Sequence, residues 1–240
     1  MKDKYILTAE SVTAGHPDKL CDTIADSILD ACLKEDPNAR VACEVLATAG
    51  KILVAGELST TASPDVESIV RQTVQNAGYD CNYHVEVRLH TQSPDIAGAV
   101  DGETLGAGDQ GIMYGCACWE TIELLPAPVV LANRITSLLT TCREEKLISG
   151  IGPDGKAQVS VQYAFGVPER VDTIVISCQH DADKDPAELR EELRRLVIAR
   201  ACHDVHIDEQ TKIFINPSGR FVLGGFEADT GLTGRKLMVD

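Results

Sequence analysis

RVACEVLATAGKILVAGEL, residues 40–58, decides the fold class because it contains two apolar segments separated by a turn. We expect strands at Arg40–Leu46 and Lys51–Leu58, joined through Thr48-Ala49-Gly50. A helix is predicted from Pro64, and Gly78 follows its end. Its apolar stripe consists of Val66, Ile69, Val70, Val74 and Ala77. The stretch therefore predicts a hairpin followed by a covering helix.

The same pattern recurs about 120 residues later in the chain. Ala157–Phe165 alternates polar and apolar residues as a strand does, and Asp172–Gln179 is a second predicted strand. A helix follows, with Asp185 as its N-cap, Pro186 in its first turn and Glu188 completing a pattern like a capping box. Two copies of hairpin and helix predict an α+β fold in which each sheet is covered by helices on one face.

A third hairpin is predicted from residues 211–215 and 220–224, around Asn216-Pro-Ser-Gly219. The glycine-rich segment 96–108 lacks periodicity, and we expect it to be a mobile loop between the two repeats.

Composition excludes several classes of protein. The 240 residues carry a formal net charge of -15, which argues against non-specific binding to nucleic acid. We find no signal peptide and no apolar run long enough to cross a membrane, so we expect a cytoplasmic protein without membrane partners. The nine cysteines are odd in number and scattered, as expected for reduced, buried thiols. Cys116-Ala-Cys118 has no second pair, which disfavours a zinc site.

Three further motif matches carry little weight. Two G-x-G-x-x-G matches, beginning at Gly106 and Gly150, do not lie between an apolar strand and a helix, as dinucleotide binding requires. The acidic run from Asp181 to Asp185 has Pro186 in place of the glycine of a calcium loop, and it indicates a helix entry instead.

His16-Pro17-Asp18-Lys19 is more informative, because it precedes a helical apolar stripe that begins at Leu20. Pro17 suits the first helical position, which makes His16 the N-cap. The free N–H groups of a helix start attract anions, Lys19 would bind a phosphate, and Asp18 could hold a divalent ion. In the alternative interpretation Asp18 complements the helix dipole beside a surface cap, and the motif alone leaves both interpretations open.

Other segments favour the first interpretation. Asp109 lies on a glycine-flanked turn, Asp154-Gly155-Lys156 places a lysine at a strand mouth, and Ser218-Gly-Arg220-Phe221 combines a cation with an aromatic face. The segment 229–236 is glycine-rich and ends in two cations. Together these residues predict a site for a nucleoside triphosphate and its metal ion.

In this order, the segments closely resemble the S-adenosylmethionine synthetase (methionine adenosyltransferase) family. The matching strings span the chain: ESVTAGHPDK, DPNARVACE, GEL, QSPDI, GAGDQG, DGKAQV, INPSGRF and DTGLTGRK. Ala14 stands where the family commonly has an acid. The resemblance implies ATP and L-methionine as substrates, attack of the thioether sulfur on ribose C5′ with release of triphosphate, and hydrolysis of that triphosphate to pyrophosphate and phosphate.

The resemblance also implies roles for individual residues. His16 and Lys156 would be catalytic, Asp18 would bind one of two Mg²⁺ ions, and Glu44 would bind K⁺. The residues implied to contact ATP are His16, Asp109, Asp154, Gly155, Lys156, Ser218, Arg220, Phe221, Asp229, Arg235 and Lys236. Those implied to contact methionine are Glu10, Glu57, Gln92 and Asp229.

Family members contain three pseudo-threefold repeats and form homodimers or homotetramers with active sites at the subunit interface. We expect an N-terminal repeat at 1–98, a gating-type loop at 99–108, a central repeat at 109–224, and the start of a C-terminal repeat at 225–240. Family members continue past GRKLMVD with further lysine and metal-binding residues, so we expect weak or no activity from this chain alone. The alternative is a non-catalytic nucleotide-binding or subunit-association module that acts with a full-length partner.

Overall fold

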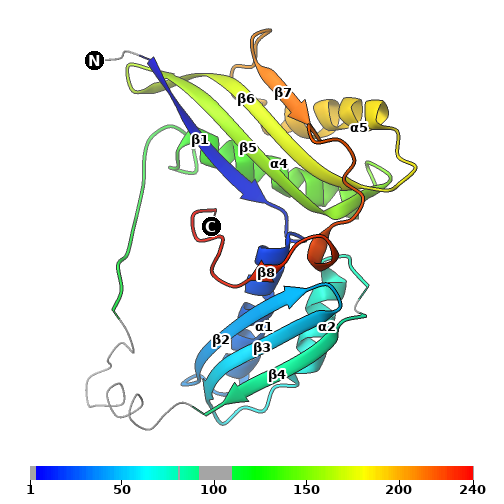
Figure 1. Ribbon diagram of the computed structural model, residues 1–240. Helices are drawn as coiled ribbons and strands as arrows, with labels where there is room; N and C mark the ends of the chain where they lie inside the picture. The colour runs from blue at the N-terminus through cyan, green and yellow to red at the C-terminus, as the bar shows by residue number, and fades with distance from the viewer. Residues whose placement is uncertain (1–3, 81, 92–109, 240) are drawn as a thin grey trace.

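Two four-stranded sheets form the framework of the protein, seen one above the other in Figure 1. The computed structural model describes residues 4–80, 82–91 and 110–239. One sheet has the order β1-β5-β6-β7 and the other the order β4-β3-β2-β8. The expected gating-type loop at 99–108, together with Gln92 and Asp109, lies outside the described residues.

The first predicted hairpin is confirmed. Strands β2 (Arg40–Thr48) and β3 (Lys51–Ser59) pair antiparallel around a turn in which Gly50 adopts a φ of +71°. Helix α2 (Val66–Asn76) follows, and the Asp65 side chain caps it by accepting from the Ser68 N–H at 3.1 Å. Strand β4 (His84–His90) then pairs parallel to β3.

The second hairpin is longer than its sequence pattern predicts. Strands β5 (Ile151–Ala164) and β6 (Val167–His180) pair antiparallel across a two-residue turn, in which Phe165 and Gly166 have φ values of 53° and 82°. Positive φ at both positions is typical of a type I′ turn, which matches the twist of paired strands. Strand β7 (Lys212–Ile215) pairs parallel to β6.

The helix after the second hairpin is also confirmed. It begins as α5 (Pro186–Leu193), continues through the π-helical turn Arg194–Ile198 and ends as α6 (Ala199–Ala201). The carboxylate of the predicted N-cap, Asp185, accepts from the Ala187 N–H at 2.6 Å.

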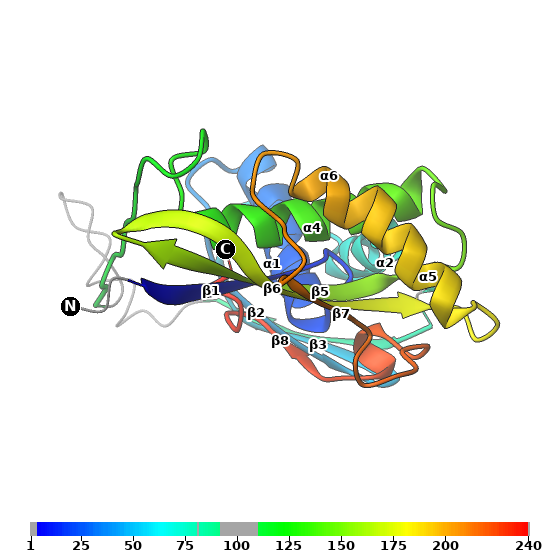
Figure 2. The same cartoon turned by 90° about the horizontal axis from the view of Figure 1, so that it is seen from above.

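The two halves have the same topology. Each contains a long helix, an antiparallel hairpin, a second helix and a strand parallel to the hairpin's second strand: α1 (Pro17–Glu35) opens one half and α4 (Ala127–Glu144) the other. Helices α4 and α5 lie on the same face of the β1-β5-β6-β7 sheet (Figure 2). The predicted α+β fold with sheets covered on one face is therefore confirmed.

The fourth strand of each sheet comes from the other end of the chain. Strand β1 (Lys4–Val12) pairs with β5 of the second repeat, and β8 (Gly231–Leu232) pairs with β2 of the first. We call β1 and β8 the exchanged edge strands. They connect two separate hydrophobic cores, one containing Ile174 and the other Ile52.

One expectation about local structure is wrong. Residues 220–224 do not form the second strand of a third hairpin. The chain turns at Asn216, whose φ is +45°, and the Asn216 side chain bonds to the backbone N–H and C=O of Cys178 at 2.8 and 3.0 Å. The backbone of Phe221 then bonds to His180. Contacts with β6 therefore replace pairing with β7.

The described cysteines are free thiols. Cys21, Cys32, Cys142 and Cys178 are buried as expected, whereas Cys43 is only half-buried. Within the described ranges, no helix has the length and apolar character needed to span a bilayer.

Candidate functional site

His16 caps helix α1, as the sequence predicts. Its ring is buried, and Nδ1 accepts a hydrogen bond from the Asp18 N–H at 3.2 Å. Burial lowers the pKa of His16 to about 4, and the positive charges of Lys156 and Lys236 act in the same direction. The imidazole is therefore neutral at pH 7, and because Nδ1 accepts, Nε2 carries the proton. His16 thus has one remaining hydrogen-bond donor.

The loop between β1 and α1 is hydrogen-bonded to the start of β5. The Thr13 N–H donates to the Gly155 carbonyl at 3.0 Å, and the Thr13 hydroxyl donates to the Pro153 carbonyl at 2.7 Å. A Cβ on Gly15 would lie 2.4 Å from the Pro153 oxygen, so only glycine allows this approach. These contacts bring His16 beside Asp154 and Lys156.

Residues from four distant segments line one cavity of about 260 Å³. The predicted residues among them are His16, Asp154, Lys156, Ser218, Arg220, Phe221 and Asp229. Pro17, Ser177 and Ala228 also line it. The cavity thus combines two cationic side chains, two acidic ones, a neutral imidazole and an aromatic ring. This combination suits an anion joined to a planar ring.

Asp154 fastens a wall of this cavity. Its side chain is buried, and Oδ2 accepts from the Gly225 N–H at 2.9 Å. Burial raises the pKa of Asp154 above its usual value, against the effects of that hydrogen bond and of Lys156. Gly155 packs closely against β6, since a Cβ there would lie 3.0 Å from the Ser177 carbonyl oxygen.

Asp18 binds the cationic end of the 229–236 segment. Its Oδ2 lies 2.6 Å from Lys236 Nζ, and its Oδ1 accepts from the Leu232 N–H and lies 3.7 Å from Arg235 Nη1. Burial raises the pKa of Asp18, but the hydrogen bonds from Lys236 and Leu232 outweigh it, so the pKa is lowered. Asp18 is therefore ionised and already paired.

The carboxylate of Asp18 fits a magnesium ion only in combination with a phosphate ligand. Its hard oxygen donors are of the type that Mg²⁺ prefers, and Mg²⁺ commonly binds through one or two carboxylates and substrate phosphates. Among residues 4–80, 82–91 and 110–239, no group of three or more His, Cys, Asp or Glu side chains could hold a metal ion by itself.

Seven described residues of the prediction do not line the cavity: Asp18, Gly155, Arg235 and Lys236, which lie in the segments described above, and Glu10, Glu44 and Glu57. Glu10 is exposed on β1, Glu44 on β2 accepts from the Thr233 hydroxyl, and Glu57 on β3 lies 3.2 Å from His90 Nε2. The structure does not bring these three carboxylates together with His16 or Lys156. Their assigned roles stay predictions.

Sequence reasoning missed Ser177 in the lining. Ser177 alternates along β6 with the buried residues Ile176 and Cys178. Because side chains alternate between the two faces of a strand, Ser177 points away from the face that Ile176 and Cys178 bury. This alternation could have predicted its place.

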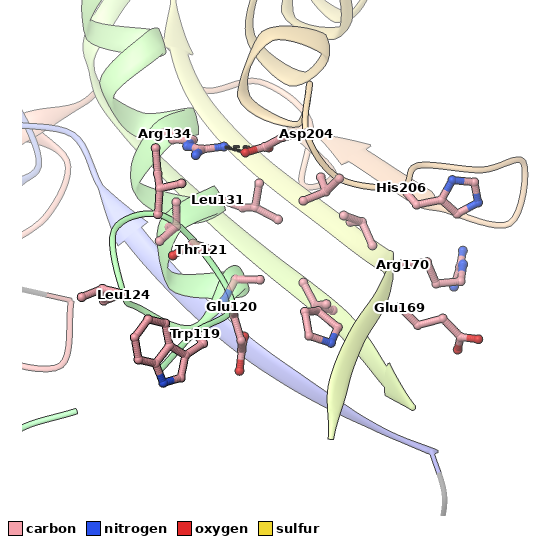
Figure 3. Close-up of a pocket in the computed structure, with 17 residues that line it drawn as sticks. Trp119, Glu120, Thr121, Leu124, Leu131, Arg134, Glu169, Arg170, Asp204 and His206 are labelled. Carbon is pink, nitrogen blue, oxygen red and sulfur yellow. Dashed lines mark hydrogen bonds and ion pairs between the residues drawn. The ribbon is translucent and has the colours of Figure 1, made fainter. Parts of the chain in front are cut away.

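A larger cavity of about 730 Å³ opens between α4 and the turn end of the β5–β6 hairpin. Its floor includes Leu131 and Val171, and Figure 3 shows Arg134 pointing toward Asp204 across it. Arg134 pairs with Asp204 at 2.8 Å and with Glu123 at 3.0 Å, so its charge is already balanced. Seven of the residues predicted to bind ATP line the smaller cavity, and we assign the candidate site there.

The two repeated α/β units meet at a cavity lined by Lys156 and Arg220 together with Asp154 and Asp229. Two family models match nearly all of the chain: the N-terminal domain of S-adenosylmethionine synthetase over residues 4–103 and its central domain over 104–221. The chain therefore belongs to the S-adenosylmethionine synthetase family. It is also 47% identical over 254 residues to the S-adenosylmethionine synthase of Finegoldia magna. That alignment covers 98% of this chain and 65% of the relative's length.

Proposed function

We propose that this chain binds ATP and L-methionine and contributes to the formation of S-adenosylmethionine. The observation that carries the proposal is the convergence of His16, Lys156, Arg220, Phe221 and Asp229 on one cavity. The family membership independently favours the same reaction. In this proposal Phe221 and Arg220 bind the nucleoside, and Lys156 binds the triphosphate.

The reaction requires stabilisation of a leaving group more than proton transfer. The methionine sulfur forms a bond to C5′ while the C5′–O bond breaks, and the electron pair departs with the triphosphate. A thioether has no proton to lose, so no general base is required. The Nε2–H of His16 would donate to the departing oxygen, where negative charge develops. The charge of Lys156 would act on the same triphosphate.

Arg235 and Lys236 would supply further positive charge from their position at Asp18. Asp18 would hold Mg²⁺ once a triphosphate is bound, and the ion would neutralise part of the phosphate charge. Glu44 is proposed to bind K⁺. Hydrolysis of the triphosphate to pyrophosphate and phosphate is proposed to follow in the same site.

The proposed methionine contacts are divided between two places. Asp229 lines the cavity, whereas Glu10 and Glu57 lie elsewhere in the chain. A single copy of the chain therefore leaves the methionine site incomplete. We propose that a second subunit supplies the missing contacts in a homodimer or homotetramer.

The test compares wild-type protein with His16→Ala and with His84→Ala, which changes an exposed histidine on β4 as a matched control. Magnesium ATP binding is measured by calorimetry and S-adenosylmethionine formation by chromatography. His16→Ala should lower turnover about 100-fold or more, because it removes a donor to the leaving group. His84→Ala should retain wild-type turnover.

Absence of ATP binding to the wild-type chain would contradict the proposal. Binding without turnover, with activity appearing only when a full-length homologue is added, would instead favour a nucleotide-binding association module.

A further inference from the structure

The last three residues of β6 hold the segment that carries Phe221. Asn216 bonds to the backbone of Cys178, and the next two residues, Gln179 and His180, bond to residues farther along the same segment. We call residues 216–222 the platform segment. No regular strand pairing fixes residues 217–222, so these contacts with β6 determine where Ser218, Arg220 and Phe221 lie.

His180 binds both backbone polar groups of Phe221. The His180 N–H donates to the Phe221 carbonyl at 2.9 Å, and the Phe221 N–H donates to His180 Nε2 at 3.2 Å. The ring is buried, and its Nδ1 lies 2.8 Å from the Asp181 carbonyl, to which it must donate. The neutral Nδ1–H tautomer satisfies both contacts. His180 therefore fixes the backbone from which the Phe221 ring projects.

Gln179 joins two walls of the cavity. Its Oε1 accepts from the Asp154 N–H at 3.1 Å, and its Nε2 donates to the Val222 carbonyl at 3.1 Å. Two glycines leave room for the amide: a Cβ on Gly152 or on Gly224 would lie 2.5 Å from Gln179 Cδ. One side chain thus sets the spacing between the Asp154–Lys156 turn and the platform segment.

Neither Gln179 nor His180 lines the cavity, so each acts through residues that do. We propose that Gln179 and His180 are positioning residues that fix the distance between the Phe221 ring and the phosphate-binding cations. They thereby make the site selective for a nucleoside triphosphate over bare tripolyphosphate. The inference rests on the proposed function, because it assigns the nucleoside to Phe221.

The test measures dissociation constants of magnesium ATP and of magnesium tripolyphosphate for the full 240-residue chain. Gln179→Leu and His180→Phe each remove side-chain hydrogen bonds and keep a side chain of related shape. Each should weaken ATP binding about 10-fold, which is the effect of one or two hydrogen bonds, and leave tripolyphosphate binding within about twofold. A merely structural defect would weaken both ligands.

Two control variants make the result specific. His180→Gln retains an acceptor near the position of Nε2, so it should restore ATP affinity to within about threefold of wild type. Cys178→Ala removes a buried side chain from the same strand without changing the backbone contacts of the platform segment. It should lower thermal stability and leave the ratio of the two dissociation constants unchanged.

Amide hydrogen exchange provides a readout that needs no ligand. Exchange of the Phe221 N–H should accelerate in His180→Phe and remain slow in Cys178→Ala. Equal weakening of ATP and tripolyphosphate, or unchanged exchange at Phe221, would overturn the inference. If the wild type binds neither ligand, the proposed function and the claimed selectivity both fail. If it binds ATP and the variants bind equally well, only the positioning roles fail.

Discussion

The two repeats have one topology but unequal edge strands. The second repeat receives the nine-residue strand β1, and the first receives β8, which has two residues. Each edge strand leads directly into site residues: β1 is followed by His16, and β8 by Arg235 and Lys236. The cavity residues of the second repeat lie at the end of its sheet where β1 leaves for α1. The comparison teaches that the exchange of edges, more than either repeat by itself, assembles the candidate site.

The largest expected effects come from shortening one buried side chain in each hydrophobic core. Ile174 and Ile52 are fully buried, one in each cluster. Replacing either with Ala should lower the free energy of unfolding by about 2–5 kcal/mol. Because the edge strands connect the repeats, circular dichroism in urea should show one transition that shifts in both variants. Two transitions, with only one displaced, would show that the repeats unfold independently.

Alanine substitutions at two glycines should disturb the packing of the exchanged edge strands. A Cβ on Gly15 would lie 2.4 Å from the Pro153 oxygen, and one on Gly231 would lie 2.4 Å from the Pro17 oxygen. Gly15→Ala and Gly231→Ala should each cost about 1–3 kcal/mol and weaken ATP binding, because backbone must move at the cavity. Gly50→Ala is the control: its φ of +71° makes Ala unfavourable, but its surroundings are open. It should cost about 1 kcal/mol and leave ATP binding intact.

Acidification tests the junction that follows β1. The pKa of His16 is lowered from 6.5 to about 4 by burial and by Lys156 and Lys236. Unfolded chains therefore take up this proton at higher pH than folded ones, and stability falls as pH drops from about 6.5 to about 4. Between pH 7 and pH 4.5 the ligand-free wild type should lose about 2 kcal/mol more than His16→Asn. Parallel melting curves for the two proteins would contradict the neutral state of His16.

The smallest expected difference lies in the hairpin turns. Phe165 has a φ of 53° and an exposed side chain, whereas Ala49 is not among the described residues with positive φ. Asn tolerates positive φ far better than Phe, so Phe165→Asn should stabilise the protein by about 0.5–1 kcal/mol. Ala49→Asn should change stability by less. Thermal melts of both variants decide whether the turns differ as their geometry predicts.

Much of the fold could be predicted from local patterns. The β2–β3 hairpin, the helix that follows it, the cap at Asp185 and the start of α1 follow from short-range signals, and each is confirmed. The partners of β1 and β8 could not be predicted, because strand alternation identifies a buried face and says nothing of which sheet it joins. Strand β4 was not predicted, although Val85, Val87 and Leu89 alternate along it.

The candidate site was predictable as a set of segments, and its geometry was not. The strings around His16, Lys156 and Phe221 indicated phosphate and base binding, and the structure places these residues around one cavity. No local pattern shows that Asp18 pairs with Lys236, because 218 residues separate them. The roles of Gln179 and His180 were not predicted for a related reason: their effect depends on a segment that has no regular structure of its own.

The exchanged edge strands also set the order in which a nascent chain can fold. Thr8 and its partner Ser160 are 152 residues apart, and Val45 and its partner Thr233 are 188 residues apart. At ribosomal speeds of about 5–20 residues per second, β1 waits on the order of ten seconds for β5 to be synthesised. During that interval the backbone N–H and C=O groups of β1 lack the partners that β5 supplies in the folded chain. The first repeat, complete in sequence long before, still lacks its last strand until residue 232 leaves the ribosome.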